Sequence, residues 1–195
     1  MRTKSDEKRQ AILDVAAEVF REAGFERASM SEICTRVGGS KATLYNYFPS
    51  KEELFFEVMF LSTEAEFEAT HKALDPTTED IGASLKNFGE RFLTLLCSPE
   101  VLAVRRLIVA ESGRSELGRL CYTRGPKRSQ AEVSRFLASA MAQGRLRQAD
   151  PLVATLHLRG LLEAELLDRF FFQVDDAVSK KEIKAITERA ICVFM

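Results

Sequence analysis

Apolar residues recur every three or four positions along most of the chain, with charged and polar residues between them. This spacing places the apolar side chains on one face of a helix, so it predicts a succession of amphipathic α-helices. The first apolar stripe runs through Ile12, Val15, Ala16, Val19 and Phe20. Gly24 follows it, at the position where a helix commonly ends in left-handed backbone. We find no alternation of apolar and polar residues long enough to predict a β-strand.

A short second helix is predicted directly after the first one. Ser29 precedes Glu32 by three residues, which is the spacing of a capping box at a helix N-terminus. Gly38 and Gly39 end this helix after about two turns, because consecutive glycines break helical structure.

Two further caps open the next helices. Ser40 is placed to cap a short helix over residues 41–48, and a proline follows that segment. Ser50 and Glu53 form a second capping box. They open a long helix that the apolar periodicity carries to about Leu74.

The rest of the chain is predicted to continue as helices that short turns separate. Ser98-Pro99 and Asp150-Pro151 each place a capping residue before a proline at the first helical position, and Ser179 opens a third capping box. The predicted segments are residues 81–96, 99–111, 117–123, 133–143, 152–172 and 180–194. The sequence therefore predicts an all-α fold of about nine helices.

Composition agrees with a globular protein. Apolar residues make up 46% and charged residues 29% of the 195 residues, so the chain can bury a core and is not of disordered composition. No apolar run approaches the roughly 20 residues of a membrane span, and the charged N-terminus does not resemble a signal peptide. We therefore expect a cytoplasmic protein that does not enter membranes.

Charge is unevenly distributed, although the formal net charge is only −1. Residues 51–100 hold four basic and eleven acidic side chains, whereas residues 101–150 hold ten basic and four acidic ones. The basic block includes Arg105, Arg106, Arg114, Arg119, Arg124, Lys127 and Arg128. It either balances the acidic segment across the fold, which we favour, or attracts an anionic ligand.

Neither cysteine nor histidine spacing indicates a metal site. Cys34, Cys97, Cys121 and Cys192 are far apart, and neither histidine lies near any of them in the sequence. We expect buried thiols, no metal ion and no cofactor. No nucleophile or phosphate-loop motif is present, so we predict no catalytic residues. An enzyme that uses His71 and His157 as acid and base remains the alternative.

The first fifty residues follow the helix-turn-helix plan: a helix, a short helix, a glycine turn and another short helix. A helix as short as 41–48 is not stable alone, so Leu44 and Phe48 must hold it against its neighbours. Its remaining side chains then face outward, and their hydroxyl, amide and ammonium groups suit contacts with phosphates and base edges. Ser29, Ser40 and Lys51 lie at helix N-termini, which favour phosphate. For these residues, serines that only cap helices and tyrosines that lie in the core are the alternative. For the chain, a helical interaction module with a vestigial DNA-binding head is the alternative.

The stretch Leu44-Tyr45-Asn46-Tyr47-Phe48-Pro49-Ser50-Lys51-Glu52-Glu53-Leu54 resembles the tetracycline-repressor (TetR) family. The resemblance covers roughly residues 5–60. The segments around Arg105–Leu120 and 144–150 are similar to its AefR-like subgroup.

The resemblance implies a DNA-binding domain over residues 1–50 and a ligand-binding and dimerisation domain over residues 51–195. It implies contacts with the major groove of double-stranded operator DNA by Lys41, Thr43, Tyr45, Asn46 and Tyr47, and phosphate contacts by Ser29, Ser31 and Lys51. A basic N-terminal arm, which either adds DNA contacts or is disordered, comprises Arg2, Lys4, Lys8 and Arg9.

The resemblance also implies a pocket for a small effector inside the C-terminal helices. The candidate lining residues are Phe60, Phe88, Phe92, Met141, His157 and Leu161. For His157 we favour a hydrogen-bonded place in the core over a contact with the effector. Since one subunit contacts one half-site, we expect a homodimer through the last two long helices. The candidate interface residues are Phe170, Phe171, Ile183, Ile191 and Phe194, for which a place in the core of the chain itself is the alternative.

Together these features predict a ligand-responsive transcriptional regulator. We expect a repressor that a small, mainly apolar effector releases from its operator. An activator, or a constitutive DNA-binding protein with a fully packed core, is the alternative.

Overall fold

The computed structural model describes residues 4–111, 113, 116–172, 174 and 177–195. These residues form eleven α-helices and, within the same ranges, no β-strand. The helices are α1 (Lys4–Arg27), α2 (Met30–Val37), α3 (Lys41–Tyr47), α4 (Lys51–Lys72), α5 (Ile81–Leu96), α6 (Pro99–Ala110), α7 (Leu117–Arg124), α8 (Pro126–Ala142), α9 (Pro151–Glu163), α10 (Leu167–Phe172) and α11 (Lys180–Phe194). The all-α prediction is confirmed.

Side-chain caps set most of the helix starts, and all of them except Asp80 were predicted. In each case a serine or aspartate oxygen accepts a hydrogen bond from the backbone N–H three residues later, which satisfies one of the free donors of the first turn. These caps are Ser29, Ser40, Ser50, Asp80, Ser98, Asp150 and Ser179. At the other end of the first helix, Gly24 has a φ of 74° and kinks α1.

The segment expected as one helix over 152–172 is divided into α9 and α10. The chain makes a turn there, in which the backbone N–H of Leu166 donates to the carbonyl of Glu163 at 2.9 Å. The side chain of Leu166 is completely buried. The turn therefore keeps Leu166 in the core.

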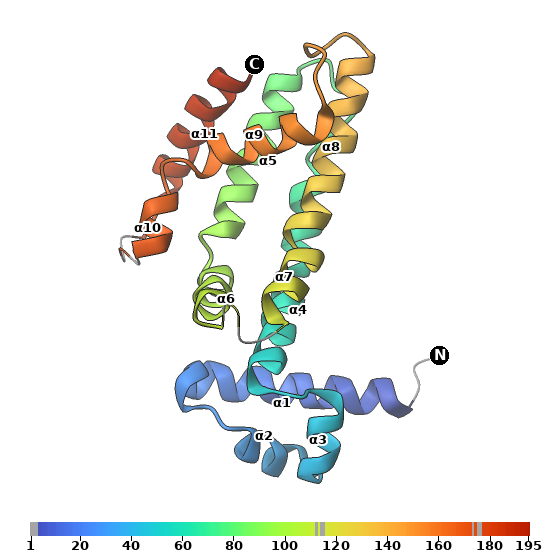
Figure 1. Cartoon of the computed structure of the whole chain (residues 1–195), viewed down its shortest axis with the longest axis vertical. Helices are drawn as coiled ribbons and strands as arrows, with labels where there is room; N and C mark the ends of the chain where they lie inside the picture. Colours follow the sequence, from blue (N-terminus) through green and yellow to red (C-terminus); the bar gives the residue numbers. More distant parts are fainter. Residues whose placement is uncertain (1–3, 112, 114–115, 173, 175–176) are drawn as a thin grey trace.

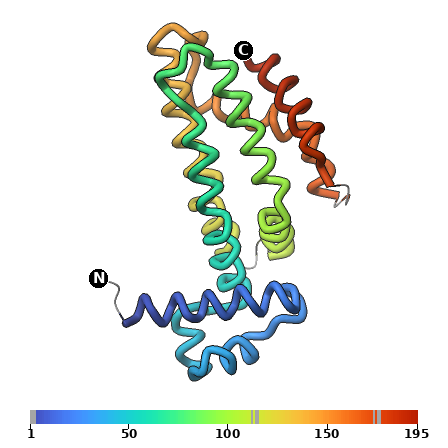
Figure 2. The backbone as a smooth tube through the Cα atoms, turned by 180° about the vertical axis from the view of Figure 1, so that it is seen from behind, coloured from blue at the N-terminus to red at the C-terminus, as the bar shows by residue number. Residues whose placement is uncertain are grey.

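The molecule has two lobes that α4 connects (Figure 1). We call α1–α3 the N-terminal lobe and α5–α11 the C-terminal bundle. Helix α4 leaves the N-terminal lobe and runs beside α7 and α8, while α9 and α11 pack against α5 on the far side. The view from behind shows α1 lying across the base of the molecule, with the C-terminus at the opposite end (Figure 2).

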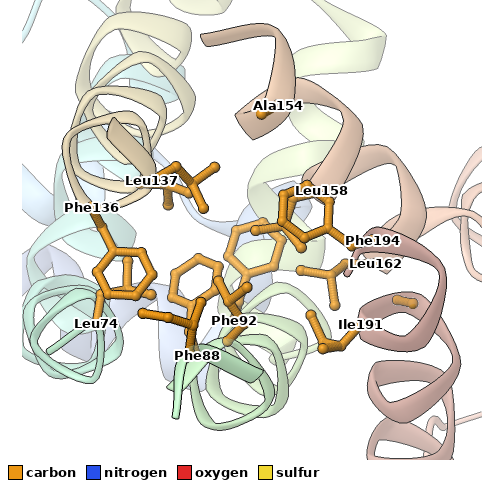
Figure 3. Close-up of a cluster of buried hydrophobic side chains, with 14 of the residues drawn as sticks. Leu74, Phe88, Phe92, Phe136, Leu137, Ala154, Leu158, Leu162, Ile191 and Phe194 are labelled. Atoms are coloured by element: carbon orange, nitrogen blue, oxygen red, sulfur yellow. The ribbon is translucent and has the colours of Figure 1, made fainter. Parts of the chain in front are cut away.

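Two hydrophobic clusters correspond only loosely to these lobes. The first joins α1–α3 to Leu54, Phe55, Phe56 and Val58 of α4, and to Val104, Leu107 and Leu117 from α6 and α7. The second fills the interior between α5, α8, α9 and α11 (Figure 3). The start of α4 thus shares a core with the N-terminal lobe. The division of the chain at residue 50 stays a prediction.

One glycine is required where three helices meet in the second cluster. A Cβ atom on Gly89 of α5 would lie 2.8 Å from Cγ2 of Thr187 and 2.9 Å from Cδ2 of Leu162. Both distances are shorter than van der Waals contact. The absent side chain therefore lets α5 approach α9 and α11 closely.

Candidate DNA-binding surface and sensor crevice

Local sequence signals build α2, α3 and the turn between them. The Ser29 side chain accepts from the N–H of Glu32 at 3.1 Å, and the Ser40 side chain accepts from the N–H of Thr43 at 3.1 Å. Gly38 ends α2 with a φ of 68°, a left-handed conformation that glycine adopts without strain. Leu44 and Phe48 are buried, as predicted, and hold the seven-residue α3 against α1 and α2.

The face of α3 opposite Leu44 is open to solvent. Lys41, Tyr45 and Asn46 are exposed, and Thr43 is half-buried. Tyr47 is also half-buried, and its hydroxyl lies 3.2 Å from Oγ of Ser5 on α1. The prediction that the polar side chains of this helix face outward is thus confirmed for Lys41, Tyr45 and Asn46.

The serines expected at phosphates are accessible to solvent. Ser29, Ser31 and Ser40 are exposed. The roles of these serines and of the α3 residues in binding DNA stay predictions.

Lys51, the predicted phosphate contact at the start of α4, is half-buried and not fully exposed. Its Nζ donates to the carbonyl oxygens of Phe25 at 2.9 Å, Ala28 at 3.2 Å and Glu26 at 3.4 Å. The ammonium group also lies 4.3 Å from the centre of the Phe25 ring. Three carbonyls engage all three of its donors, so Lys51 first of all fixes the C-terminal end of α1, and Ala28 just after it, to the start of α4.

The basic N-terminal arm is largely a helix. Lys4, Lys8 and Arg9 belong to α1, whereas Arg2 lies outside the described residues. The guanidinium of Arg9 turns inward, 5.1 Å from the centre of the Phe48 ring. Arg9 is therefore part of the packing of the N-terminal lobe, and a disordered arm is excluded from Lys4 onward.

A buried carboxylate joins the N-terminal lobe to the C-terminal bundle. Glu57 on α4 is only 9% exposed. It binds Arg9 of α1 at 2.8 Å and also pairs with Arg124 of α7. The Arg124 guanidinium lies 3.9 Å from the centre of the Phe60 ring. One acidic group thus holds basic groups from both lobes, since a buried carboxylate needs such partners.

The interpretation that the basic block balances the acidic segment agrees with several contacts. Arg124 pairs with Glu57, and Arg128 binds Glu64 at 2.6 Å and pairs with Glu68. These pairs attach α7 and α8 to α4. Arg114 of the same block lies outside the described residues.

The predicted pocket residues divide into two groups. Phe88, Phe92 and Met141 are buried in the second cluster, and the half-buried Leu161 packs against it. Phe60 belongs to the other cluster, under Arg124. His157 is exposed on α9. The proposal of Phe60 and His157 as members of one pocket must therefore be corrected, and His157 is not a core residue either.

A narrow crevice opens between α5, α8 and α9. Phe88, Phe92, Val133, Leu158 and Leu162 form its apolar walls, and Ser129, Gln130, Thr155 and Arg159 add polar groups. The rings of Phe88 and Phe92 stack with centres 5.5 Å apart. The crevice has room for about one water molecule, so a larger ligand must move these helices apart.

Sequence reasoning missed the four polar residues of this crevice. A signal was present, because Ser129 and Val133 on α8, and Thr155 and Arg159 on α9, are spaced four apart and so share a helix face. Polar residues that recur within an apolar face mark a place where the face borders a polar opening.

A histidine supports the polar side of the crevice from α4. Nδ1 of His71 lies 2.8 Å from the carbonyl oxygen of Phe67, so it donates, and Nε2 lies 2.8 Å from Oγ of Ser129. Burial lowers the pKa of His71, because desolvation disfavours the imidazolium form. The neutral ring accepts the Ser129 hydroxyl hydrogen, which fixes the direction of that hydroxyl group.

The predicted dimer residues require a correction. Ile183, Ile191 and Phe194 are buried in the core of the chain itself and offer almost no surface to a partner. Figure 3 shows Ile191 and Phe194 within this cluster. Phe170 is half-buried, and the guanidinium of Arg105 lies 4.7 Å from its ring centre. Of the five residues, only Phe171 is largely exposed, at 65%.

Other apolar side chains on the same helices are exposed instead. Leu152 and Leu156 on α9, Leu167 on α10 and Val193 on α11 all reach solvent. Leu152, Leu156 and Gly160 are four residues apart on α9, so they form one stripe along that helix.

The cysteines are more varied in burial than expected. All four are free; Cys34 is buried, Cys97 and Cys121 are half-buried, and Cys192 is exposed. Burial raises the pKa values of Cys97 and Cys121, which keeps these thiols protonated. The expectation of buried thiols is therefore wrong for Cys192.

The described residues contain neither a membrane-spanning helix nor a cluster of metal-binding side chains. No helix in the described ranges is both long and apolar enough to cross a membrane. Among the same residues, no group of three or more His, Cys, Asp or Glu side chains is placed to hold a metal ion.

Family models match both ends of the chain. The model described as bacterial regulatory proteins, tetR family, matches residues 12–58. The model described as AefR-like transcriptional repressor, C-terminal domain, matches residues 83–195, which is more than half of the chain. The first match includes α2 and α3, and the second includes the crevice.

Solved structures resemble nearly the whole chain. A TetR-family transcriptional regulator from Mesorhizobium loti MAFF303099 is 28% identical, with a TM-score of 0.83 over 99% of this chain and 97% of that one. The flavonoid-responsive regulator FrrA is 31% identical, with a TM-score of 0.71 over 96% of this chain and 95% of that one.

Curated relatives match a shorter region. The HTH-type transcriptional activator FasR from Mycolicibacterium smegmatis is 38% identical over 79 residues, which are 40% of this chain and 36% of that protein. The HTH-type transcriptional regulator UidR from Escherichia coli strain K12 is 41% identical over 64 residues, 33% of each chain. The matched region therefore spans only about a third of the length of these two relatives.

Proposed function

The chain belongs to the TetR family of DNA-binding transcriptional regulators, and from this premise we propose that it is a repressor that a small effector releases from its operator. The description of the C-terminal family model as that of a transcriptional repressor supports the direction of control. We propose no catalytic role.

We propose that α3 enters the major groove of operator DNA. Lys41, Tyr45 and Asn46 then contact base edges and phosphates, with Thr43 and Tyr47 beside them. Ser29, Ser31 and Ser40 bind phosphates at the N-terminal ends of α2 and α3, where free N–H groups favour anions. The open face of α3 supports this assignment.

The observation that carries the proposed regulation is the course of α4. Its start shares a core with the N-terminal lobe through Leu54 and Phe55, and its end reaches the crevice through His71, which contacts Ser129 and Phe88. A helix of 22 residues is roughly 33 Å long. A ligand that widens the crevice therefore moves one end of a rod whose other end holds the N-terminal lobe.

We propose that the effector is small and mainly apolar and that it binds between α5, α8 and α9. The stacked rings of Phe88 and Phe92 suit an aromatic or aliphatic body. The name of the relative FrrA, a flavonoid-responsive regulator, supports an aromatic molecule as one class to test. A constitutive DNA-binding protein is the competing function.

Selection of binding sites from random duplexes is the experiment that tests DNA binding by the full chain. We expect an enriched site with two half-sites, because each subunit of a dimer contacts one of them. Failure to enrich any sequence would contradict the proposed function.

Two tyrosine variants then test the surface. Tyr45→Ala removes an exposed side chain of α3 and should weaken binding to the selected duplex about tenfold or more, with an unchanged unfolding temperature. Tyr122→Ala removes a similarly exposed tyrosine on α7 and should leave the affinity unchanged. Equal affinities for the two variants would show that α3 is not the reading helix.

A further inference from the structure

We infer that the effector carries an acidic group: the crevice takes a small apolar carboxylate, and the Arg159 guanidinium binds its oxygen atoms. The inference rests on the proposed function, because it assigns the effector to this crevice. It adds the chemical class of the ligand and the residue that selects it.

Arg159 is the one charged residue among the described residues that line the crevice. The walls on either side of it are apolar, and the other polar groups are neutral. One of these, the Ser129 hydroxyl, is already bound to His71, and the Thr155 hydroxyl donates to the carbonyl of Pro151 at 2.8 Å. The guanidinium is thus the strongest donor that the crevice offers to a ligand.

The ion cluster beside the crevice has an excess of positive charge. Glu163 is 8% exposed and binds Arg159 at 2.6 Å and Arg105 at 2.9 Å. Two guanidinium groups share one carboxylate, so these three residues together carry a charge of +1. A partly buried cluster of this kind favours a further anion, since each charge away from water needs a partner.

The shared carboxylate of Glu163 also keeps the free-energy cost low when Arg159 turns toward a ligand. If Arg159 turns its donors toward a bound carboxylate, Glu163 keeps its second bond to Arg105. No buried carboxylate is left without a partner, which is the step that otherwise makes the rupture of a buried ion pair expensive. The planar guanidinium can then bind both oxygen atoms of the ligand.

The test compares acids with their neutral amides, which differ little in shape. The probes are cinnamate and cinnamamide, octanoate and octanamide, and indole-3-acetate and indole-3-acetamide, with the full chain in calorimetric titrations. We expect at least one acid to bind about tenfold more tightly than its amide, because charge-assisted hydrogen bonds are the stronger ones. Equal binding of acid and amide in every pair, or no binding by any acid, would overturn the inference.

Arg159→Gln should abolish the preference for the acid and change the affinity for the amide little. Arg135→Gln makes the same change at an exposed arginine of α8 and should leave the preference intact. If Arg159→Gln does not fold, Arg159→Lys keeps the charge but loses the two-pronged geometry, and the preference should then fall severalfold. An undiminished preference in a folded Arg159 variant would refute the assignment.

Binding of the selected duplex by the protein without ligand separates the two ideas. A protein that binds its duplex but shows no preference for acids retains the proposed function and loses this inference. A protein that prefers acids to amides but binds no duplex keeps the acid site at Arg159 and loses the proposed function.

Discussion

At the scale of single residues, Lys51 of the family motif stabilises the fold through its hydrogen bonds, whether or not it also contacts DNA. Its ammonium group donates to three carbonyl oxygens, two in the last turn of α1 and that of Ala28 just after it. Without these bonds, the carbonyls of Phe25 and Ala28 would lose their partners in a partly buried place. Hydrogen bonds that involve a charged group contribute more than neutral ones.

We therefore predict that Lys51→Met lowers the free energy of unfolding by about 1–2 kcal/mol. Methionine keeps an apolar side chain near Phe25 but cannot donate. Lys41→Met, at an exposed lysine of α3, should change stability by less than about 0.5 kcal/mol. Urea unfolding of both variants measures the difference, and equal stabilities would contradict the structural role.

The same variants show whether Lys51 also contacts DNA. A direct phosphate contact predicts that the dependence of log affinity on log salt becomes shallower by about one in Lys51→Met. A role in positioning alone predicts weaker binding with an unchanged slope.

The roles of some residues follow from the local sequence, whereas the surroundings of others depend on tertiary contacts. Ser40 and Ser50 cap the helices that follow them because a cap depends only on the next three residues. The surroundings of Lys51 and His157 depend on which helix packs beside them, and no pattern within their own segments contains that information.

At the scale of helices, the junction around Glu57 connects α1, α4 and α7. It is the one place described above where an acidic residue of α4 pairs with basic residues from both lobes. Because the carboxylate is buried, loss of its charge leaves two guanidinium groups without their partner.

We predict that Glu57→Gln destabilises the protein by about 1–3 kcal/mol, below the full cost of breaking a buried pair because Arg9 and Arg124 are partly solvated. Glu66→Gln is the matched control on the same helix, since Glu66 pairs with Arg91 at 3.5 Å on the surface. That control should change stability by less than about 1 kcal/mol. Thermal unfolding of both variants checks the ranking, and similar values would mean that the junction contributes little.

Helix boundaries were predictable where sequence signals exist and not elsewhere. Asp150-Pro151 correctly marked the start of α9. The break between α9 and α10 has no such signal, because Ala164 and Glu165 both favour a helix. Leu166 is completely buried at this break, and Glu163 pairs with Arg105 of α6, 58 residues away in the chain. No pattern within α9 itself contains such a contact.

At the scale of the whole molecule, the dimer surface could not be predicted either, because it depends on contacts between segments that are distant in the sequence. Apolar periodicity identifies which residues share a helix face, but it cannot tell whether that face meets another helix of the same chain or a second copy. Ile191 and Phe194 meet α5 and α9 within the chain. Leu156 and Val193, on the same two long helices, remain exposed.

We therefore expect that the dimer forms through the exposed faces of α9 and α11, with Phe171 at the edge. Leu156→Glu should raise the dissociation constant of the dimer about a hundredfold or more, because a symmetric interface contains the substitution twice and each carboxylate loses water without gaining a partner. Tyr122→Glu, on the exposed face of α7, should leave the dimer intact. Sedimentation over a range of concentrations measures both.

Binding to DNA tests whether this surface is the functional dimer interface and not only a weak contact between subunits. A monomer holds one half-site only, so it loses the gain in effective concentration that two linked reading helices provide. Leu156→Glu should then bind an isolated half-site as the unchanged protein does, but bind the complete selected duplex much more weakly. A variant that stays dimeric in sedimentation, or a monomeric variant that binds the complete duplex with full affinity, would place the functional contact elsewhere on the molecule.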